Sequence, residues 1–145
     1  MFEIRPMQSE DLPAIMRIEN LAFPNPWCEE FLASWENWES WVICSEDGTL
    51  RGYIMYYTVV DEGEIINFAI DPAFQRQGLG TLLLSRTLGE IRKRGIRRLF
   101  LEVRASNLAA QELYKRFGFV RLGSRKDYYS KPVEDAIIMG CEDER

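Results

Sequence analysis

One short run of residues has the types and order that bind a phosphate group: Gln75, Arg76, Gln77, Gly78, Leu79 and Gly80. It follows an apolar segment with strand character and opens a segment with helical periodicity. The first N–H groups of a helix have no internal partner and carry partial positive charge, and glycine lets the backbone approach a pyrophosphate closely. Arg76 can add a charge-assisted hydrogen bond. The run indicates an anion site at a helix N-terminus, with a plain glycine helix entry as the alternative.

Two better-known phosphate motifs do not fit this run. A Walker motif ends in Gly-Lys-Ser/Thr, whereas Gly80 is followed by Thr81 and Leu82. The dinucleotide fingerprint needs glycine or alanine three residues after Gly80, where Leu83 stands. Neither a P-loop nor a dinucleotide-binding loop is therefore expected.

Acid–base chemistry in this chain must proceed without histidine. Ser-His-Asp, Cys-His and histidine–metal mechanisms are excluded. Glu102, near the end of an expected strand, and Tyr114, on the helix that follows, are the candidates, because strand ends often carry site residues in open α/β sheets. The alternatives are a surface acid at Glu102, paired with Arg104 on the same strand face, and a core aromatic at Tyr114.

The three cysteines give no sign of a disulfide framework or a zinc site. Cys28, Cys44 and Cys141 form no Cys-x-x-Cys pair, and their number is odd. We expect small buried thiols and no metal. A cysteine acyl-enzyme route is disfavoured, since none of the three has an adjacent base motif.

The residues above must be positioned by a mixture of helices and strands. Residues 9–21 predict a helix that opens at Ser9, a proline-containing loop covers 23–27, and a short helix covers 29–35. Strands are expected at 40–44, 50–60 and 64–70, with a hairpin turn at 61–63. A helix at 78–94 places Leu82 inward and ends at Gly95. A strand at 98–103, a helix capped by Asn107 and a last strand at 134–141 complete a mixed α/β order of β-α-α-β-β-β-α-β-α-β-β.

Composition is that of an ordinary soluble domain. The chain has 145 residues, of which 46% are hydrophobic and 28% charged, and we expect one domain over residues 1–145. No apolar run reaches the length of a membrane span, and the N-terminus lacks a signal-peptide pattern, so a cytoplasmic protein is expected.

Charge is distributed unevenly along the chain. Residues 1–71 hold 14 acidic and 3 basic side chains, whereas residues 72–145 hold 9 acidic and 15 basic ones. The functional interpretation is a basic half for an anionic cofactor and an acidic half for a cationic substrate; the alternative is two solvated faces. A sequence pI near 4.9 disfavours direct binding of nucleic acid.

The phosphate-binding run resembles the signature of the GNAT acetyltransferases, which read Gln/Arg-x-x-Gly-x-Gly/Ala at this helix entry. Residues 71–80 and 101–107, together with 22–24, 128–129 and 134–139, are similar to the RimI-type ribosomal-protein alanine N-acetyltransferases. The resemblance implies a mostly antiparallel central sheet flanked by helices, with strands four and five splayed apart. It also implies that acetyl-CoA is the co-substrate.

Roles for individual residues follow from the resemblance. Glu102 corresponds to the general base and Tyr114 to the general acid. The implied cofactor-binding residues are Phe68, Ala69, Ile70, Gln75, Arg76, Gln77, Gly78, Leu79, Gly80, Thr81 and Asn107. Asn107 is an equally good helix cap. We expect Phe23, Trp27, Tyr128 and Tyr129 to wall the acceptor groove, because amphipathic rings suit contact surfaces.

The acceptor implied by the resemblance is the N-terminal alanine of a ribosomal protein, a partner with a basic N-terminus. An α-amine with a pKa near ~7.8 is already about one-tenth neutral at pH 7, whereas deprotonating a lysine near ~10.4 costs roughly 4.6 kcal/mol. One carboxylate therefore suits an α-amine better. A polyamine or aminoglycoside acceptor, a protein lysine, and a non-enzymatic CoA-binding module remain as alternatives.

Overall fold

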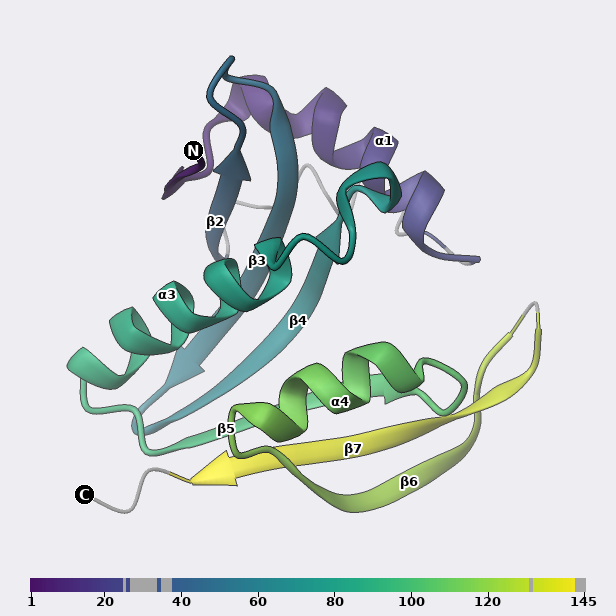
Figure 1. Cartoon of the computed structure of the whole chain (residues 1–145). Helices are drawn as coiled ribbons and strands as arrows, with labels where there is room; N and C mark the ends of the chain where they lie inside the picture. The colour runs from purple at the N-terminus through teal and green to yellow at the C-terminus, as the bar shows by residue number, and fades with distance from the viewer. Residues whose placement is uncertain (25, 27–33, 35–37, 131, 143–145) are drawn as a thin grey trace. The chain divides into compact units, whose positions relative to one another are not determined.

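We describe the protein from a computed structural model of residues 1–145, apart from residues 25, 27–33, 35–37, 131 and 143–145. The expected helix at 29–35 lies outside the described residues. The elements, labelled in Figure 1, are β1 Glu3–Pro6, η1 Ser9–Asp11, α1 Leu12–Ala22, β2 Glu39–Cys44, β3 Leu50–Val59, β4 Glu62–Ile70, η3 Pro72–Phe74, α3 Leu79–Lys93, β5 Arg98–Arg104, α4 Leu108–Arg116, β6 Val120–Tyr129 and β7 Glu134–Glu142.

The strands form one seven-stranded sheet in the order β1-β2-β3-β4-β5-β7-β6. The pairs β1–β2, β2–β3, β5–β7 and β6–β7 are antiparallel, and β4 with β5 is parallel. The parallel register joins Glu62 through Ile65 to Arg98 through Leu101, whereas β4 continues to Ile70 and β5 to Arg104. This mixed, mostly antiparallel sheet with flanking helices confirms the expected fold class.

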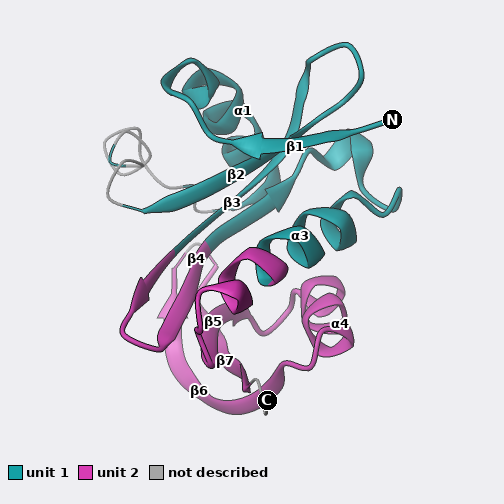
Figure 2. Cartoon of the chain, turned by 90° about the vertical axis from the view of Figure 1, so that its left-hand side faces the viewer, with its two compact units in different colours: residues 1–56, 67–88 teal, residues 57–66, 89–145 magenta. Residues whose placement is uncertain are grey.

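The chain divides into two compact units, shown in teal and magenta in Figure 2. Unit 1 comprises residues 1–56 and 67–88, and unit 2 comprises residues 57–66 and 89–145. The strands β3 and β4 and the helix α3 each contribute to both units. The expectation of a single domain stays a prediction.

Each unit has its own apolar core. In unit 1 the fully buried side chains include Ile15 and Ile18 of α1, Tyr53 and Met55 of β3, and Leu83 of α3. In unit 2 the core contains Leu99, Leu101 and Val103 of β5, Tyr114 of α4, Phe119, and Met139 of β7. Alternate residues of β5 are buried, as expected for a strand with one face in a core. That alternation leaves Phe100 and Glu102 on the opposite face.

Helix faces differ from the sequence prediction in both α1 and α3. Leu82, expected to point inward, is 50% exposed, and Leu21 near the end of α1 is 59% exposed. Glu19 is instead buried in α1 because it accepts hydrogen bonds from the Tyr53 hydroxyl and from Asn67 Nδ2. Leu84 takes the inward position in α3. Apolar periodicity missed Glu19 because burial of a polar residue depends on partners distant in sequence.

The start of α1 also differs from the prediction. Ser9 does not cap α1. It is the first residue of the 3-10 turn η1, which precedes α1 and is capped by Gln8, and Asp11 occupies the cap position of α1. Asp11 accepts a hydrogen bond from the Gln8 N–H at 2.8 Å and forms a two-pronged ion pair with Arg5, both contacts at 2.8 Å. The carboxylate that the sequence places in the first helical turn therefore closes a tertiary contact to β1.

The β3–β4 turn is at Val60 and Asp61, and β4 begins at Glu62 rather than at Glu64. Gly63, expected in the turn, is a strand residue. A Cβ there would lie 2.9 Å from Leu99 Cδ2 and 3.2 Å from the Tyr57 carbonyl oxygen. Glycine at this position permits a close approach within the sheet. From the sequence alone, a glycine needed for a close approach cannot be told from a glycine needed for a turn.

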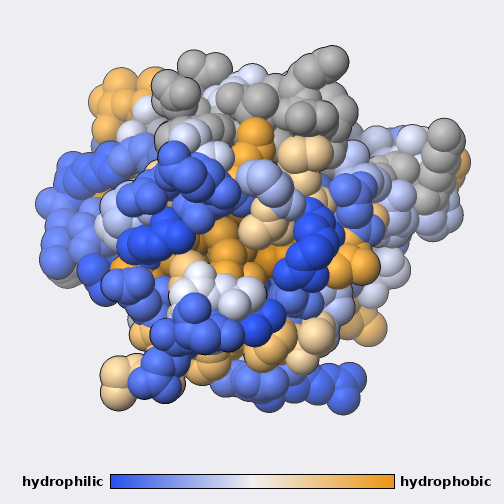
Figure 3. Space-filling model, turned by 90° about the horizontal axis from the view of Figure 1, so that it is seen from above, coloured by the Kyte–Doolittle hydropathy of each residue, from blue (hydrophilic) through white to orange (hydrophobic). Residues whose placement is uncertain are grey.

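The surface is mixed in character. Seen from above in Figure 3, hydrophilic residues cover most of one face, and apolar residues show between them. In the part of the chain that the structure describes, no helix is both long and apolar enough to cross a membrane.

Candidate active site

The expected phosphate-binding run forms an exposed loop in unit 1 that leads into α3. Gln75, Arg76, Gln77 and Gly78 are exposed, and α3 begins at Leu79. Arg76 has φ 66° and Gly78 has φ 80°, so two residues of the loop adopt the left-handed conformation. Successive backbone N–H groups in such turns form concave anion sites. A Cβ built on Gly78 meets no atom within 4 Å, so the space beside it is open.

The conformation of Arg76 is unusual for a residue with a side chain. The left-handed region costs a non-glycine residue roughly 1–2 kcal/mol. Such strain persists where the surrounding structure holds the backbone, and it is frequent at ligand-binding sites. The backbone of this loop is therefore a candidate anion site, with its N–H groups as donors and Arg76 as an added cation.

A charged cluster supports the strand end before this loop. Asp71, 3% exposed, lies 3.1 Å from Arg17 Nη2 and 3.9 Å from Arg51 Nη1, and it caps η3 by accepting from the Ala73 N–H at 3.0 Å. The Arg51 guanidinium also stacks on the Phe74 ring at 3.8 Å. Sequence reasoning missed this cluster, although an Asp-Pro pair after a strand is a recognisable cap signal.

The remaining expected cofactor residues occupy several kinds of position. Phe68, Ala69 and Ile70 form the end of β4, and Gln75 Nε2 donates to the Ile70 carbonyl at 3.3 Å. The Leu79 side chain is buried, so only its backbone N–H could contact a ligand. Gly80 and Thr81 lie in the first turn of α3. Asn107, in unit 2, is confirmed as the cap of α4: its side chain accepts from the Ala110 N–H at 3.1 Å.

The two expected catalytic residues both belong to unit 2. Glu102 is on β5, with its side chain 22% exposed, and Tyr114 is on α4 and 7% exposed. Burial, and then the neighbouring Tyr129, raises the pKa of the Tyr114 phenol well above its ordinary value. Tyr114 also packs against Phe119 with 5.6 Å between ring centroids. The core-aromatic interpretation therefore describes its ring correctly and does not conflict with a role for its hydroxyl.

Tyr129 connects the two candidates. Burial, then Glu102, raises its pKa to about 12, and its phenol acts in turn on the pKa of Tyr114. The Arg104 guanidinium lies 4.3 Å from the Tyr129 ring centroid. Sequence reasoning placed Tyr129 in the acceptor wall, whereas the structure places it beside both Glu102 and Tyr114.

Glu102 does not pair with Arg104, so the alternative of an ion pair between these two residues of one strand is wrong. Arg125 Nε of β6 lies 2.9 Å from Glu102 Oε2, without the alignment of a hydrogen bond, and Arg104 instead pairs with Glu134 at 2.8 Å. The order β5-β7-β6 makes these cross-strand partners available. Sequence separation of 23 residues hides the Glu102–Arg125 pair from any local pattern.

Three of the four residues expected to wall the acceptor groove lie in the described part of the chain. Tyr128 and Tyr129 end β6 in unit 2, with ring centroids 5.0 Å apart in an edge-to-face arrangement, and Tyr128 is 52% exposed. Phe23 follows α1 in unit 1 and is half-buried. Trp27 lies outside the described residues.

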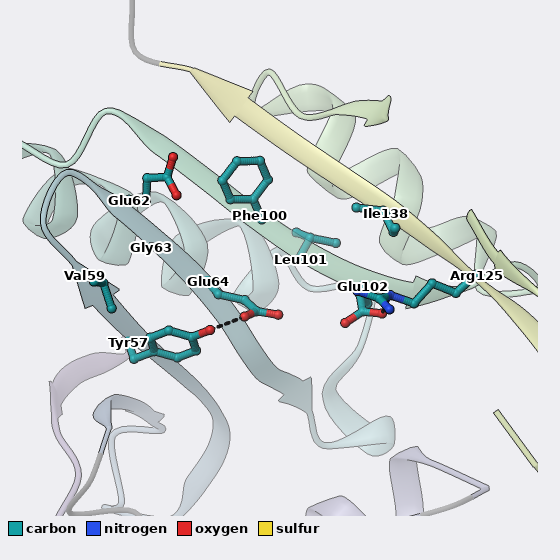
Figure 4. Close-up of a pocket in the computed structure, with 10 residues that line it drawn as sticks. All are labelled: Tyr57, Val59, Glu62, Gly63, Glu64, Phe100, Leu101, Glu102, Arg125 and Ile138. Atoms are coloured by element: carbon teal, nitrogen blue, oxygen red, sulfur yellow. Dashed lines mark hydrogen bonds and ion pairs between the residues drawn. The ribbon is translucent and has the colours of Figure 1, made fainter. Parts of the chain in front are cut away.

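Glu102 faces a cavity of about 420 Å³ in unit 2 (Figure 4). Its walls come from five strands and include the carboxylates of Glu62 and Glu64. A carboxylate at the edge of an accessible cavity can take a proton from a bound acceptor, and a phenol that burial keeps protonated can offer its hydroxyl to a leaving group.

Comparisons with known proteins agree with this geometry. Residues 12–119 match the model of the acetyltransferase (GNAT) family. The ribosomal protein bS18-alanine N-acetyltransferase of Escherichia coli (strain K12) is 41% identical over 140 residues, which are 94% of each chain. The crystal structure of the ribosomal-protein-S18-alanine N-acetyltransferase from Escherichia coli superposes with a TM-score of 0.91 at 40% identity, over 98% of this chain and 94% of that one.

A more distant structure shares the fold. A GNAT family acetyltransferase from Elizabethkingia anophelis, solved with acetyl-CoA bound, has a TM-score of 0.81 at 21% identity over 98% of both chains. The matched span includes the phosphate-binding loop, Glu102 and Tyr114. On these findings, the chain belongs to the acetyltransferase (GNAT) family.

Proposed function

We propose that this protein transfers an acetyl group from acetyl-CoA to the N-terminal α-amine of a ribosomal protein, with alanine as the accepted residue. The observation that carries the proposal is the 41% identity, over 94% of each chain, to an enzyme named for acetylating the alanine of ribosomal protein bS18. The position of Glu102 at an open cavity supports it.

The backbone of residues 75–81 binds the pyrophosphate of acetyl-CoA. Its left-handed residues and the start of α3 direct N–H groups outward, and Arg76 adds positive charge. The strand end at Phe68, Ala69 and Ile70 lies beside the pantetheine arm. When bound, acetyl-CoA supplies a thioester whose carbonyl carbon is the electrophile.

Glu102 removes a proton from the acceptor ammonium, and the neutral nitrogen attacks the carbonyl carbon. A carbon–nitrogen bond forms, the carbon–sulfur bond breaks, and the hydroxyl of Tyr114 donates its proton toward the departing sulfur. Burial keeps the Tyr114 phenol protonated at neutral pH, which is the form an acid requires. The nitrogen of the new amide loses its second proton to solvent, and a proton returned from Glu102 to the Tyr114 phenolate through solvent restores the starting state, so each turnover releases one proton.

A competition between three acceptors tests the proposal. The purified protein and acetyl-CoA are incubated with a basic peptide that begins with alanine, with the same peptide blocked at its α-amine but carrying a free internal lysine, and with spermidine. Mass spectrometry locates the acetyl group, and release of the CoA thiol gives the rate. Faster acetylation of the free α-amine supports the proposal, and preference for lysine or spermidine overturns it.

A further inference from the structure

The cavity beside Glu102 is larger than the proposed proton transfer requires. Ten residues line it: Tyr57, Val59, Glu62, Gly63, Glu64, Phe100, Leu101, Glu102, Arg125 and Ile138. They come from β3, β4, β5, β6 and β7, and all belong to unit 2. The cavity therefore extends from Glu102 along the face of the sheet toward the start of β4 (Figure 4).

Its lining joins an apolar surface to an excess of negative charge. Phe100, Leu101, Ile138 and Val59 supply apolar area, while three carboxylates face one guanidinium, that of Arg125. Arg125 pairs with Glu102 at 2.9 Å, and Glu62 lies 3.4 Å from Arg98 Nε. Two of the three carboxylates thus have a cation beside them.

Glu64 is the carboxylate that the described residues leave without a cation. Its hydrogen bond comes from the hydroxyl of Tyr57, a neutral donor, drawn as a dashed line in Figure 4. That bond raises the pKa of Tyr57, so the phenol stays a neutral donor to Glu64. An oriented carboxylate beside an aromatic ring and above an apolar floor fits a long side chain with a cationic end.

We propose that this cavity binds the side chain of an arginine in the acceptor protein, at the second or third residue of its chain; the inference rests on the proposed function. Guanidinium fits better than ammonium because it is planar, stacks on rings and can bond a carboxylate with two N–H groups. The apolar stem lies on Phe100 and Ile138, and the guanidinium meets Glu64.

The spacing along the strands sets which residue reaches the cavity. Glu64 is in register with Phe100, two residues before Glu102 on β5. Strand geometry puts the Cα atoms of Glu64 and Glu102 about 8 Å apart, from a rise of about 3.3 Å per residue and about 4.8 Å between strands. An extended acceptor whose amine lies at Glu102 covers that distance within two or three residues.

The experiment compares peptides that begin with alanine and carry one arginine at position two, three, four or five, each against the same peptide with neutral citrulline. For the unmodified protein we expect the KM to be fivefold to tenfold lower with arginine at position two or three, and equal within twofold at position five. The variant Glu64→Gln should reduce that preference to less than twofold without changing the KM for acetyl-CoA. Glu112→Gln, an exposed acid of α4 outside the cavity, is the matched control and should keep the preference.

Each result separates the inference from the proposed function. If the peptides are acetylated at the α-amine but Glu64→Gln keeps the full arginine preference, the inference is wrong and the proposed function stands. If no peptide is acetylated, the proposed function fails, and calorimetric binding of the same peptide pairs to the CoA-loaded protein still tests the cavity. There, arginine preference that disappears in Glu64→Gln supports the inference, and equal binding of arginine and citrulline peptides overturns it. Should Glu64→Gln fail to fold, Glu64→Asp, which keeps the charge on a shorter side chain, must weaken the preference.

Discussion

Replacing Tyr114 by phenylalanine removes one hydroxyl from a ring that the structure buries. The ring is 7% exposed and packs against Phe119 at 5.6 Å, and phenylalanine keeps that packing. Losing one hydrogen-bonding group in a protein interior costs about 1 kcal/mol of net stability. For a chain of this length we therefore expect the Tm to fall by about 2–4 °C.

The effect on turnover should be much larger than the effect on stability. One positioned acid contributes at least roughly 10²-fold to the rate, which corresponds to about 2.7 kcal/mol of transition-state free energy. Because the hydroxyl acts on the departing sulfur and not on the bound coenzyme, kcat should fall while the KM for acetyl-CoA stays within twofold. Burial raises the pKa of Tyr114, so kcat of the unmodified protein should not decline up to about pH 9 through loss of this proton.

The assay is thiol release at saturating acetyl-CoA, with Tm measured on the same preparations. Tyr129→Phe is the matched control, because Tyr129 is a half-buried tyrosine whose pKa burial and Glu102 raise to about 12. We expect it to lower kcat less than Tyr114→Phe does. A Tyr114→Phe protein with normal kcat would refute the reasoning, and a larger loss in Tyr129→Phe would transfer the acid role to Tyr129.

Three further predictions concern unit 1. Gly78→Glu places a negative side chain at an open site with φ 80° and should abolish CoA binding in calorimetry. Gly78→Ala adds the same backbone strain without the charge and should weaken CoA binding about tenfold or less. Near-normal affinity in a folded Gly78→Glu protein would contradict the loop assignment. Arg51→Gln removes the stack on Phe74 and should raise the KM for acetyl-CoA twofold to fivefold with kcat unchanged; a change in kcat alone would contradict a positioning role. Burial raises the pKa of Asp11, but hydrogen bonds from Arg5 and Gln8 outweigh burial and leave this pKa below its ordinary value. The contribution of the Asp11 carboxylate to stability is therefore full above about pH 4 and is lost as the pH falls through its folded-state pKa. The Tm difference between the unmodified protein and Asp11→Asn should therefore shrink below pH 4 in thermal melts, and a difference that grows there would contradict it.

The sequence predicted the element order and the fold class well because both depend on local signals. Alternating burial in β5, the cap at Asn107 and the glycine stop at Gly95 follow from neighbouring residues. The loop at residues 75–78 and the helix start that follows were also predictable, since the glycines and the helix start are adjacent in the chain. Its left-handed Arg76 was not, because no residue-type preference marks a strained arginine.

Predictions failed where a side chain depends on distant strands. Gly63 has the appearance of a turn residue and serves instead as a close-contact residue against Leu99. Glu102 could be placed on a strand from the sequence, but its partner Arg125 required the order of β5, β7 and β6. The cavity depends on the same register, so neither its carboxylates nor Tyr57 could be grouped beforehand.

The chemistry of the cluster at Glu102 bears on which amine it can use. The proposed mechanism uses one carboxylate as base and, as acid, a phenol whose pKa burial raises. Presenting a neutral α-amine at pH 7 costs about 1.1 kcal/mol, against roughly 4.6 kcal/mol for lysine, from pKa values near ~7.8 and ~10.4. The difference of about 3.5 kcal/mol corresponds to roughly 400-fold in rate if nothing else compensates. We therefore expect the proposed acid–base pair, with an acidic cavity beside it, to favour an acceptor whose reacting nitrogen is easily deprotonated and whose following residues are cationic. The pH dependence of kcat/KM should accordingly rise through the pKa of the peptide α-amine, and a rise delayed to about pH 10 would favour a lysine acceptor instead.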